Sequence, residues 1–222
     1  MQDLLRNRAS PSRLVSLNNV LVTNQKVAIM GTGLGGLLSI GASTMPADLS
    51  QWVMKCYDPL KSQLVIPNRG RIPVDADSVN MMWGLPNSGM KVIWECNTEV
   101  TQAFSEEYGF NPGNIAPSFS AWCKMIESMD GAHDDRFVRA WTVIAFDCFL
   151  APTTALKVSS RCYLAVSDLQ LLAKSNVCQF VVDQTKIAFL DRGSKKSVCC
   201  CVYNLVVSTS HLYLFSVPFF CC

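Results

Sequence analysis

The pattern with the clearest chemical meaning in this sequence is a glycine cluster. Gly31-Thr-Gly33-Leu-Gly-Gly36 follows the apolar run Lys26-Val-Ala-Ile-Met30 and fits the form G-x-G-x-x-G. Glycines at this spacing let a backbone cradle a pyrophosphate at the N-terminus of the following helix. A dinucleotide fold also needs a second strand that ends in an acidic residue, but residues 44–58 have the pattern of a capped helix. We therefore interpret residues 31–36 as a glycine-rich bend at a helix terminus. A dinucleotide-binding enzyme is the third alternative for function.

A second polar group is formed by His133, Asp134 and Asp135. One histidine beside two adjacent acids that face different directions lacks the convergent geometry of a metal site. A helix cap and compensation of the helix dipole explain the two acids better.

Two further pairs of acids have the composition of a general acid and base. A helix cap accounts for Asp75 with Asp77. A solvated helix face accounts for Glu106 with Glu107. The sequence contains no G-x-S-x-G, P-loop, H-E-x-x-H or paired C-x-x-C motif. With two histidines in the chain, a Cys/His nucleophile pair has no supporting signature. We predict no catalytic, cofactor-binding or metal-binding residues and no enzyme.

Size and composition favour one folded domain with a substantial core. The chain has 222 residues, of which 50% are hydrophobic and 16% are charged. Nineteen basic and 17 acidic residues give a formal net charge of +2, and neither sign forms a long block. Composition therefore does not support binding to nucleic acid, and the partners that we expect are proteins of unknown identity.

Eleven cysteines raise the question of disulfides. The segment Met1 to Arg13 carries four charged residues and no apolar stretch, so we expect no export signal there. Without export, we predict reduced, structural cysteines in a chain of the cytosol or nucleus.

Capping and helix-breaking residues divide the chain into predicted elements. Asp75 fits an N-cap, Gly84 fits a left-handed residue at the end of the same helix, and Ser43 or Thr44 fits a cap for the helix before it. Pro73 predicts that the last strand of a short hairpin lies at an edge. We predict this hairpin over residues 63–74 and helices over residues 14–29, 46–56, 75–83, 98–108, 118–129, 134–150, 159–166, 168–174 and 177–190.

The predicted fold class is mainly α, as a single helical domain with one short β-hairpin. The helix over residues 134–150 is strongly apolar and should lie at the centre of the core. Large side chains at helical spacing should pack around it, namely Trp52, Met81, Met82, Trp83, Trp122, Phe137, Trp141, Phe146, Phe149, Phe180, Val181, Ile187 and Leu190.

Several of these segments together resemble the plant mobile domain, also called aminotransferase-like. The resemblance covers residues 13–190 and rests on motifs that are distinctive only in combination: Gly31-Thr-Gly-Leu-Gly-Gly-Leu-Leu38, Leu49-Ser-Gln-Trp52, Tyr57-Asp-Pro59, Ile72-Pro-Val-Asp75, Trp83-Gly-Leu-Pro86, Ala145-Phe146, Phe149-Leu-Ala-Pro152-Thr and Val158-Ser159. Thr32 and Leu34 depart from the usual pattern around the glycines.

What the resemblance implies is a non-catalytic interaction domain derived from a plant mobile element. Domains of that type occur in transposon-derived genes, and some relatives act in nuclear genome maintenance or silencing. The resemblance therefore implies a nuclear location, and it brings no catalytic residue or cofactor with it.

The sequence changes character after Asp191. Residues 198–217 carry no charge, and the final 24 residues hold five cysteines. We therefore divide the chain into an N-terminal extension (1–12), a helical domain (13–190) and an apolar, cysteine-rich tail (191–222) that stands apart from the body. The tail has the composition of either non-native sequence or a membrane anchor through residues 198–217. A tail-anchored membrane protein with a cytosolic helical domain is thus the second alternative for function.

Overall fold

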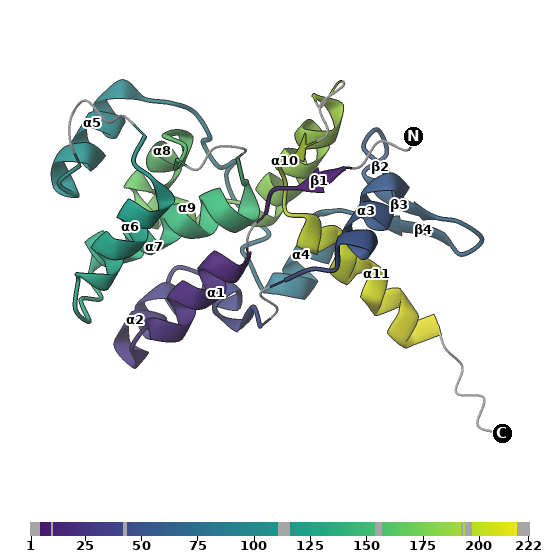
Figure 1. Ribbon diagram of the computed structural model, residues 1–222, viewed down its shortest axis with the longest axis horizontal. Helices are drawn as coiled ribbons and strands as arrows, with labels where there is room; N and C mark the ends of the chain where they lie inside the picture. The colour runs from purple at the N-terminus through teal and green to yellow at the C-terminus, as the bar shows by residue number, and fades with distance from the viewer. Residues whose placement is uncertain are drawn as a thin grey trace.

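The computed structural model describes residues 5–9, 11–41, 44–110, 116–153, 157–191, 193 and 197–216, and of residues 210–216 it describes the backbone. Its elements are mostly helices, as the sequence predicts (Figure 1). In chain order they are β1 (Arg6–Asn7), α1 (Pro11–Val20), α2 (Thr23–Met30), η1 (Gly35–Ser39), α3 (Ala47–Cys56), β2 (Tyr57–Asp58), β3 (Gln63–Ile66), β4 (Gly70–Pro73), α4 (Ala76–Trp83), α5 (Thr98–Glu107), α6 (Phe119–Glu127), α7 (Asp135–Ala145), η2 (Phe146–Leu150), α8 (Arg161–Ser167), α9 (Leu169–Ala173), α10 (Val177–Leu190), β5 (Ser197–Val198) and α11 (Val202–Ser216).

The helix α7 and the π-helical turn η2 form the centre of the core. Asp134 caps α7 by accepting a hydrogen bond from the backbone N–H of Phe137 at 2.9 Å. Every residue from 140 to 150 is buried, so this part of the continuous helix has no solvent-facing side. The prediction of a central core helix is confirmed, and its last turn widens into a π-helix.

A short polar network joins three elements inside this core. The buried Trp141 donates its indole N–H to Asn18 Oδ1 at 2.9 Å, and Asn18 Nδ2 donates to the carbonyl oxygen of Leu37 at the same distance. The network therefore links α7, α1 and η1 and satisfies polar groups that burial would otherwise leave unpaired.

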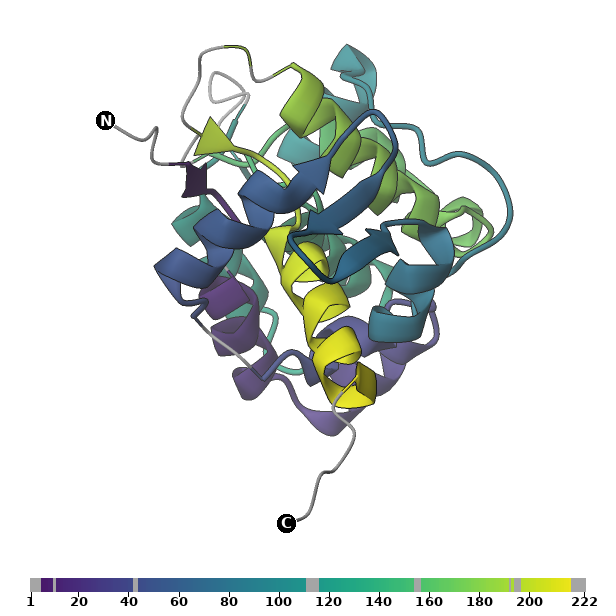
Figure 2. The same ribbon diagram turned by 90° about the vertical axis from the view of Figure 1, so that its right-hand side faces the viewer.

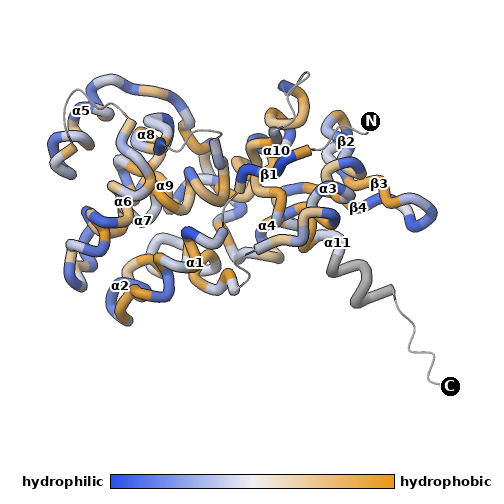
Figure 3. The backbone as a smooth tube through the Cα atoms, in the orientation of Figure 1, coloured by the Kyte–Doolittle hydropathy of each residue, from blue (hydrophilic) through white to orange (hydrophobic). Residues whose placement is uncertain are grey.

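The small sheet lies at the end of the molecule that is distant from α5 and α6 (Figure 1). β3 and β4 form the predicted hairpin, and β2 adds a third antiparallel strand beside β3, so that Pro73 lies in an edge strand. The turn between β3 and β4 is hydrophilic (Figure 3). Asp75 then caps α4 by accepting from the N–H of Ser78 at 2.9 Å, and Gly84 ends that helix with φ 60°, both as predicted.

The structure corrects several local predictions. The predicted helix over residues 14–29 is two helices, because Gln25 accepts a hydrogen bond from the N–H of Val22 at 3.0 Å and starts α2 in a new direction. This break leaves Val20 and Val27 exposed. α3 begins after Pro46 with no side-chain cap, so Thr44 does not fill that role, and Ser43 lies outside the described residues.

Three of the predicted core side chains are exposed instead. Met81 is 74% exposed, because it lies on the face of α4 opposite the buried Val79 and the packed Trp83. Ile187 and Leu190 are 46% and 47% exposed at the end of α10, where the buried face is carried by residues such as Val181 and Thr185.

Residues 197–209 pack against the body, in contrast to the expectation that the tail stands apart. β5 pairs in parallel with β1, so the predicted extension and the predicted tail join each other. Val198, Cys200 and Val202 form a buried cluster with Met54, and Leu205 is fully buried with residues of the sheet. In Figure 2, α11 runs between α3 and α4, both of which it contacts. None of the helices in the described part of the chain has both the length and the apolarity to cross a membrane.

The glycine cluster connects a helix to a 3-10 helix. α2 ends at Met30, Gly33 takes a left-handed conformation with φ 79°, and η1 follows at Gly35. A Cβ atom added to Gly36 would lie 1.6 Å from the carbonyl oxygen of Trp83. The prediction of a bend at a helix terminus is therefore confirmed. Close backbone packing against the end of α4 explains why residue 36 is a glycine.

We expect Gly36→Ala to lower the free energy of unfolding by about 1–3 kcal/mol or more, because the backbone at Trp83 must move to admit the methyl group. Gly41→Ala is the matched control, since an added Cβ there meets nothing within 4 Å and should change stability by less than about 1 kcal/mol. Urea unfolding followed by circular dichroism measures both. Equal stability of the two variants would show that the close approach at Gly36 does not constrain the fold.

We also expect Leu205→Ala to lower the free energy of unfolding by about 2–5 kcal/mol, because it leaves a cavity beside Val53 and Leu64. Val207→Ala, at a half-buried position of the same helix, should lower the free energy of unfolding much less. Thermal unfolding of the full chain compares the two. An unchanged melting temperature in Leu205→Ala would mean that α11 does not contribute to the folded body.

Candidate binding groove

Five of the six acidic residues considered from the sequence have local structural partners. Asp77 accepts a hydrogen bond from Asn87 Nδ2 at 2.6 Å, and Glu107 forms an ion pair with Arg139 at 2.7 Å. The remaining partners are Ser78 for Asp75, Gln102 for Glu106, Phe137 for Asp134 and the carbonyl of Gly131 for His133. The prediction that Asp75 and Asp134 are helix caps is confirmed. Across the described residues, no three His, Cys, Asp or Glu side chains converge as metal ligands.

Asp147 is the one charged residue among the buried side chains that the structure describes. Its Oδ1 accepts a hydrogen bond from the backbone N–H of Ser159 at 2.9 Å, which fixes the turn before α8. Burial raises the pKa of Asp147 to about 6, while the Ser159 hydrogen bond and the positive charge of Arg13 act in the opposite direction. A carboxyl group with this pKa suits proton transfer, but Asp147 does not line either of the cavities described next.

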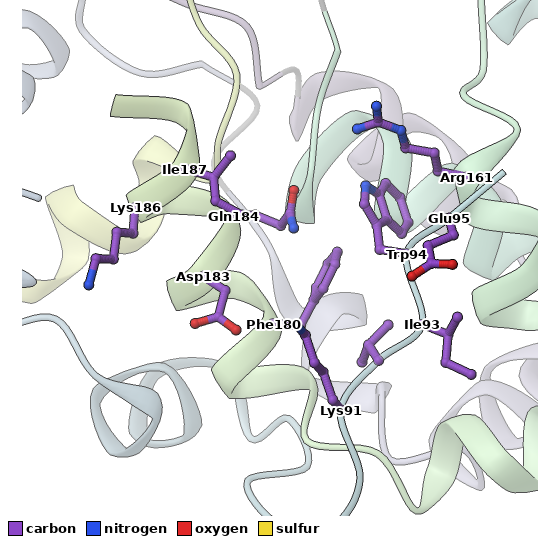
Figure 4. Close-up of a pocket in the computed structure, with 11 residues that line it drawn as sticks. Lys91, Ile93, Trp94, Glu95, Arg161, Phe180, Asp183, Gln184, Lys186 and Ile187 are labelled. Carbon is purple, nitrogen blue, oxygen red and sulfur yellow. The ribbon is translucent and has the colours of Figure 1, made fainter. Parts of the chain in front are cut away.

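A groove lies between an extended segment and the helix α10. One wall consists of the consecutive residues 91–95, and the other consists of residues of α10 (Figure 4). The cavity has a volume of about 530 Å³, within the range typical of ligand sites. A second cavity of about 470 Å³ adjoins it and shares Trp94, Arg161, Gln184 and Ile187 with it. We call the first cavity the α10 groove.

Aromatic side chains form the floor of the α10 groove. Trp94 packs against Phe180 with ring centroids 5.1 Å apart and stacks on Phe146 at 5.8 Å. Figure 4 shows Phe180 and Gln184 turned toward Trp94, whereas Lys186 extends away. Exposed Ile187 adds apolar surface to the α10 wall. The groove thus has a preformed apolar floor that is held in place by the main core.

Charged residues of both signs surround this floor, namely Lys91, Glu95, Arg161, Asp183 and Lys186. Asp183 accepts a hydrogen bond from Gln179 Nε2 at 2.8 Å. The other four form no ion pair within the described part of the chain. An apolar centre with a polar, mixed-charge rim is the usual composition of a surface that binds protein segments.

Our sequence predictions missed this site entirely. They left residues 84–97 without an element and assigned Ile187 to the core. A signal was present in Val92-Ile93-Trp94, a run of β-branched and aromatic residues between Gly89 and Asn97, which is typical of a strand. No local signal showed that α10 would leave a groove beside it.

The structure therefore defines the chain as a mainly helical domain with a surface groove beside α10. Residues 7–206 match a family described as a domain of unknown function, DUF8566, and the chain belongs to that family. No curated protein and no solved structure matches the chain.

This match corrects the resemblance to the plant mobile domain, because the family that matches the chain is a different one. The motifs around Gly31–Gly36 and Trp83–Pro86 are explained by the close packing of η1 on the end of α4. The expected nuclear location and transposon origin depended on that resemblance and lose their support with it. The match also includes residues 191–206, which we had placed outside the family domain.

Asp147 gives a prediction for the pH dependence of stability. Its pKa is higher in the folded chain than its ordinary value of 3.8, so the folded state binds the proton more tightly, and this stabilising contribution is lost as the pH rises through about 6. Asp147→Asn cannot titrate. We expect the stability of this variant relative to the wild type to increase from pH 4 to pH 7, by at most about 3 kcal/mol.

Chemical unfolding of both proteins across this pH range measures the difference. Because other titrating groups are common to the two chains, their contributions cancel. A difference that is constant with pH would contradict the assigned burial of a titrating carboxyl at residue 147.

Proposed function

We propose that this chain is a non-catalytic interaction domain that binds a segment of a partner protein in the α10 groove. The observation that carries the proposal is the apolar floor formed by the half-buried Trp94 and the buried Phe180 at the bottom of a cavity between two walls. Binding there would cover exposed apolar surface of the α10 wall, including Ile187, which is 46% exposed.

The rigidity of the floor supports binding without a large loss of entropy. Trp94 and Phe180 both contact Phe146 of η2, which is fully buried. A partner would therefore meet side chains that are already ordered, which lowers the cost of association. Aromatic residues in such positions commonly contribute much of the binding free energy of an interface.

The charges around the floor favour a protein segment over a polyanion as the partner. Three cationic residues, Lys91, Arg161 and Lys186, are accompanied by the anionic Glu95 and Asp183. A nucleic-acid site would be expected to show cations with few acids between them. A peptide that presents an apolar side chain between polar residues matches the groove better.

We expect selection of short random peptides on the purified full chain to yield ligands that bind in this groove. Ile187→Arg should raise the dissociation constant of a selected peptide by about tenfold or more, because it places a long charged side chain over the apolar floor. Fluorescence anisotropy of the labelled peptide measures the dissociation constant.

Leu190→Arg is the matched control. Leu190 is on the same helix and is 47% exposed, against 46% for Ile187, but it does not line the groove. The control should bind the peptide as the wild type does. If no peptide is enriched, or if both substitutions leave binding unchanged, the α10 groove is not the interaction site.

A further inference from the structure

The wall formed by residues 91–95 runs as an extended segment beside α10 (Figure 4). Val92 is 4% exposed and Trp94 packs into the core, while Lys91, Ile93 and Glu95 between and beside them face solvent. This alternation is the period of a β-strand. Within the described residues, no backbone N–H or C=O of residues 91–95 has a hydrogen-bond partner.

The chain is anchored immediately before this unpaired stretch. The N–H of Met90 donates to the carbonyl of Lys174 at 3.0 Å, and the N–H of Asn176 donates to the carbonyl of Met90 at 2.7 Å, which makes a parallel bridge between Met90 and Ser175. Gly89 permits this close approach, since a Cβ there would lie 2.0 Å from the Lys174 carbonyl oxygen.

This bridge fixes the direction of the following backbone groups. In an extended chain, the N–H and C=O of every second residue point to the same side. Because those of Met90 point toward residues 174–176, those of Val92 and Trp94 point to the same side, where α10 begins at Val177 and strand pairing stops. The groove therefore opens at a position where the described part of the chain supplies no strand partner for residues 91–95.

From this geometry we infer that the occupant of the α10 groove is an extended segment of a partner protein, which adds as a β-strand beside residues 91–95. Its backbone pairs with the N–H and C=O groups of Val92 and Trp94. One of its apolar side chains packs on Trp94, Phe180 and Ile187. Such strand addition derives affinity from main-chain hydrogen bonds and selectivity from alternate side chains.

This inference rests on the proposed function and is tested with the same selected peptide. A set of variants of that peptide carries one N-methyl group each, which removes one backbone N–H donor at a time. For an added strand, we expect loss of binding by about tenfold or more at every second position of the central residues, with little change at the positions between.

Amide hydrogen exchange of the protein, measured by NMR, gives a second readout. On peptide binding, the amides of Val92 and Trp94 should become protected, whereas those of Ile93 and Glu95 should change little. A merely apolar contact with the floor would not produce this alternation.

The outcomes separate the two claims. If a peptide binds the groove but its N-methyl variants show no period of two, or show a dependence on positions three and four apart as for a helix, strand addition is wrong while the proposed function stands. If no peptide binds, both fail. A dimer that dissociates in Ile187→Arg would overturn the inference by showing that a second copy of the chain occupies the groove.

Discussion

Complete burial of residues 140–150, which are the larger part of the central helix α7 with η2, is the constraint on which the rest of the structure depends. A helix without a solvent-facing side must be covered all round, and the remaining helices provide that cover. Burial also makes an unpaired polar group on this helix costly. Asn18 is the partner of Trp141, and the N–H of Ser159 is that of Asp147.

The same core holds the candidate site in place. Residues 91–95 are held by the side chain of Val92, which is buried in the core, by that of Trp94, which packs against the core, and by the bridge at Met90. Backbone hydrogen bonds are thus not needed to order this segment. The arrangement leaves an ordered strand edge open beside α10, which is a feature that folded proteins usually cover or interrupt.

The parts of the fold that could be predicted are those set by local chemistry. The caps at Asp75 and Asp134 and the left-handed Gly84 depend on hydrogen bonds or steric limits within a few residues, so their sequence signals were reliable. The position of residues 197–209 could not be predicted, because an uncharged, cysteine-rich segment suits a protein core and a bilayer equally well. Only distant partners such as Val53 and Leu64 distinguish the two. The groove was missed for the same reason, since it depends on how two distant segments diverge.

The burial of the cysteines couples the folded state to thiol chemistry. Among the cysteines that the structure describes, five are buried: Cys148, Cys162, Cys178, Cys200 and Cys201. Burial raises the pKa of Cys178 and Cys201 to about 12, so the reactive thiolate is scarce at neutral pH. Unfolding would expose these thiols together and return them to ordinary reactivity. The folded state therefore protects these thiols from oxidation and cross-linking. The rate at which alkylating reagents modify the buried thiols reports how often the chain opens.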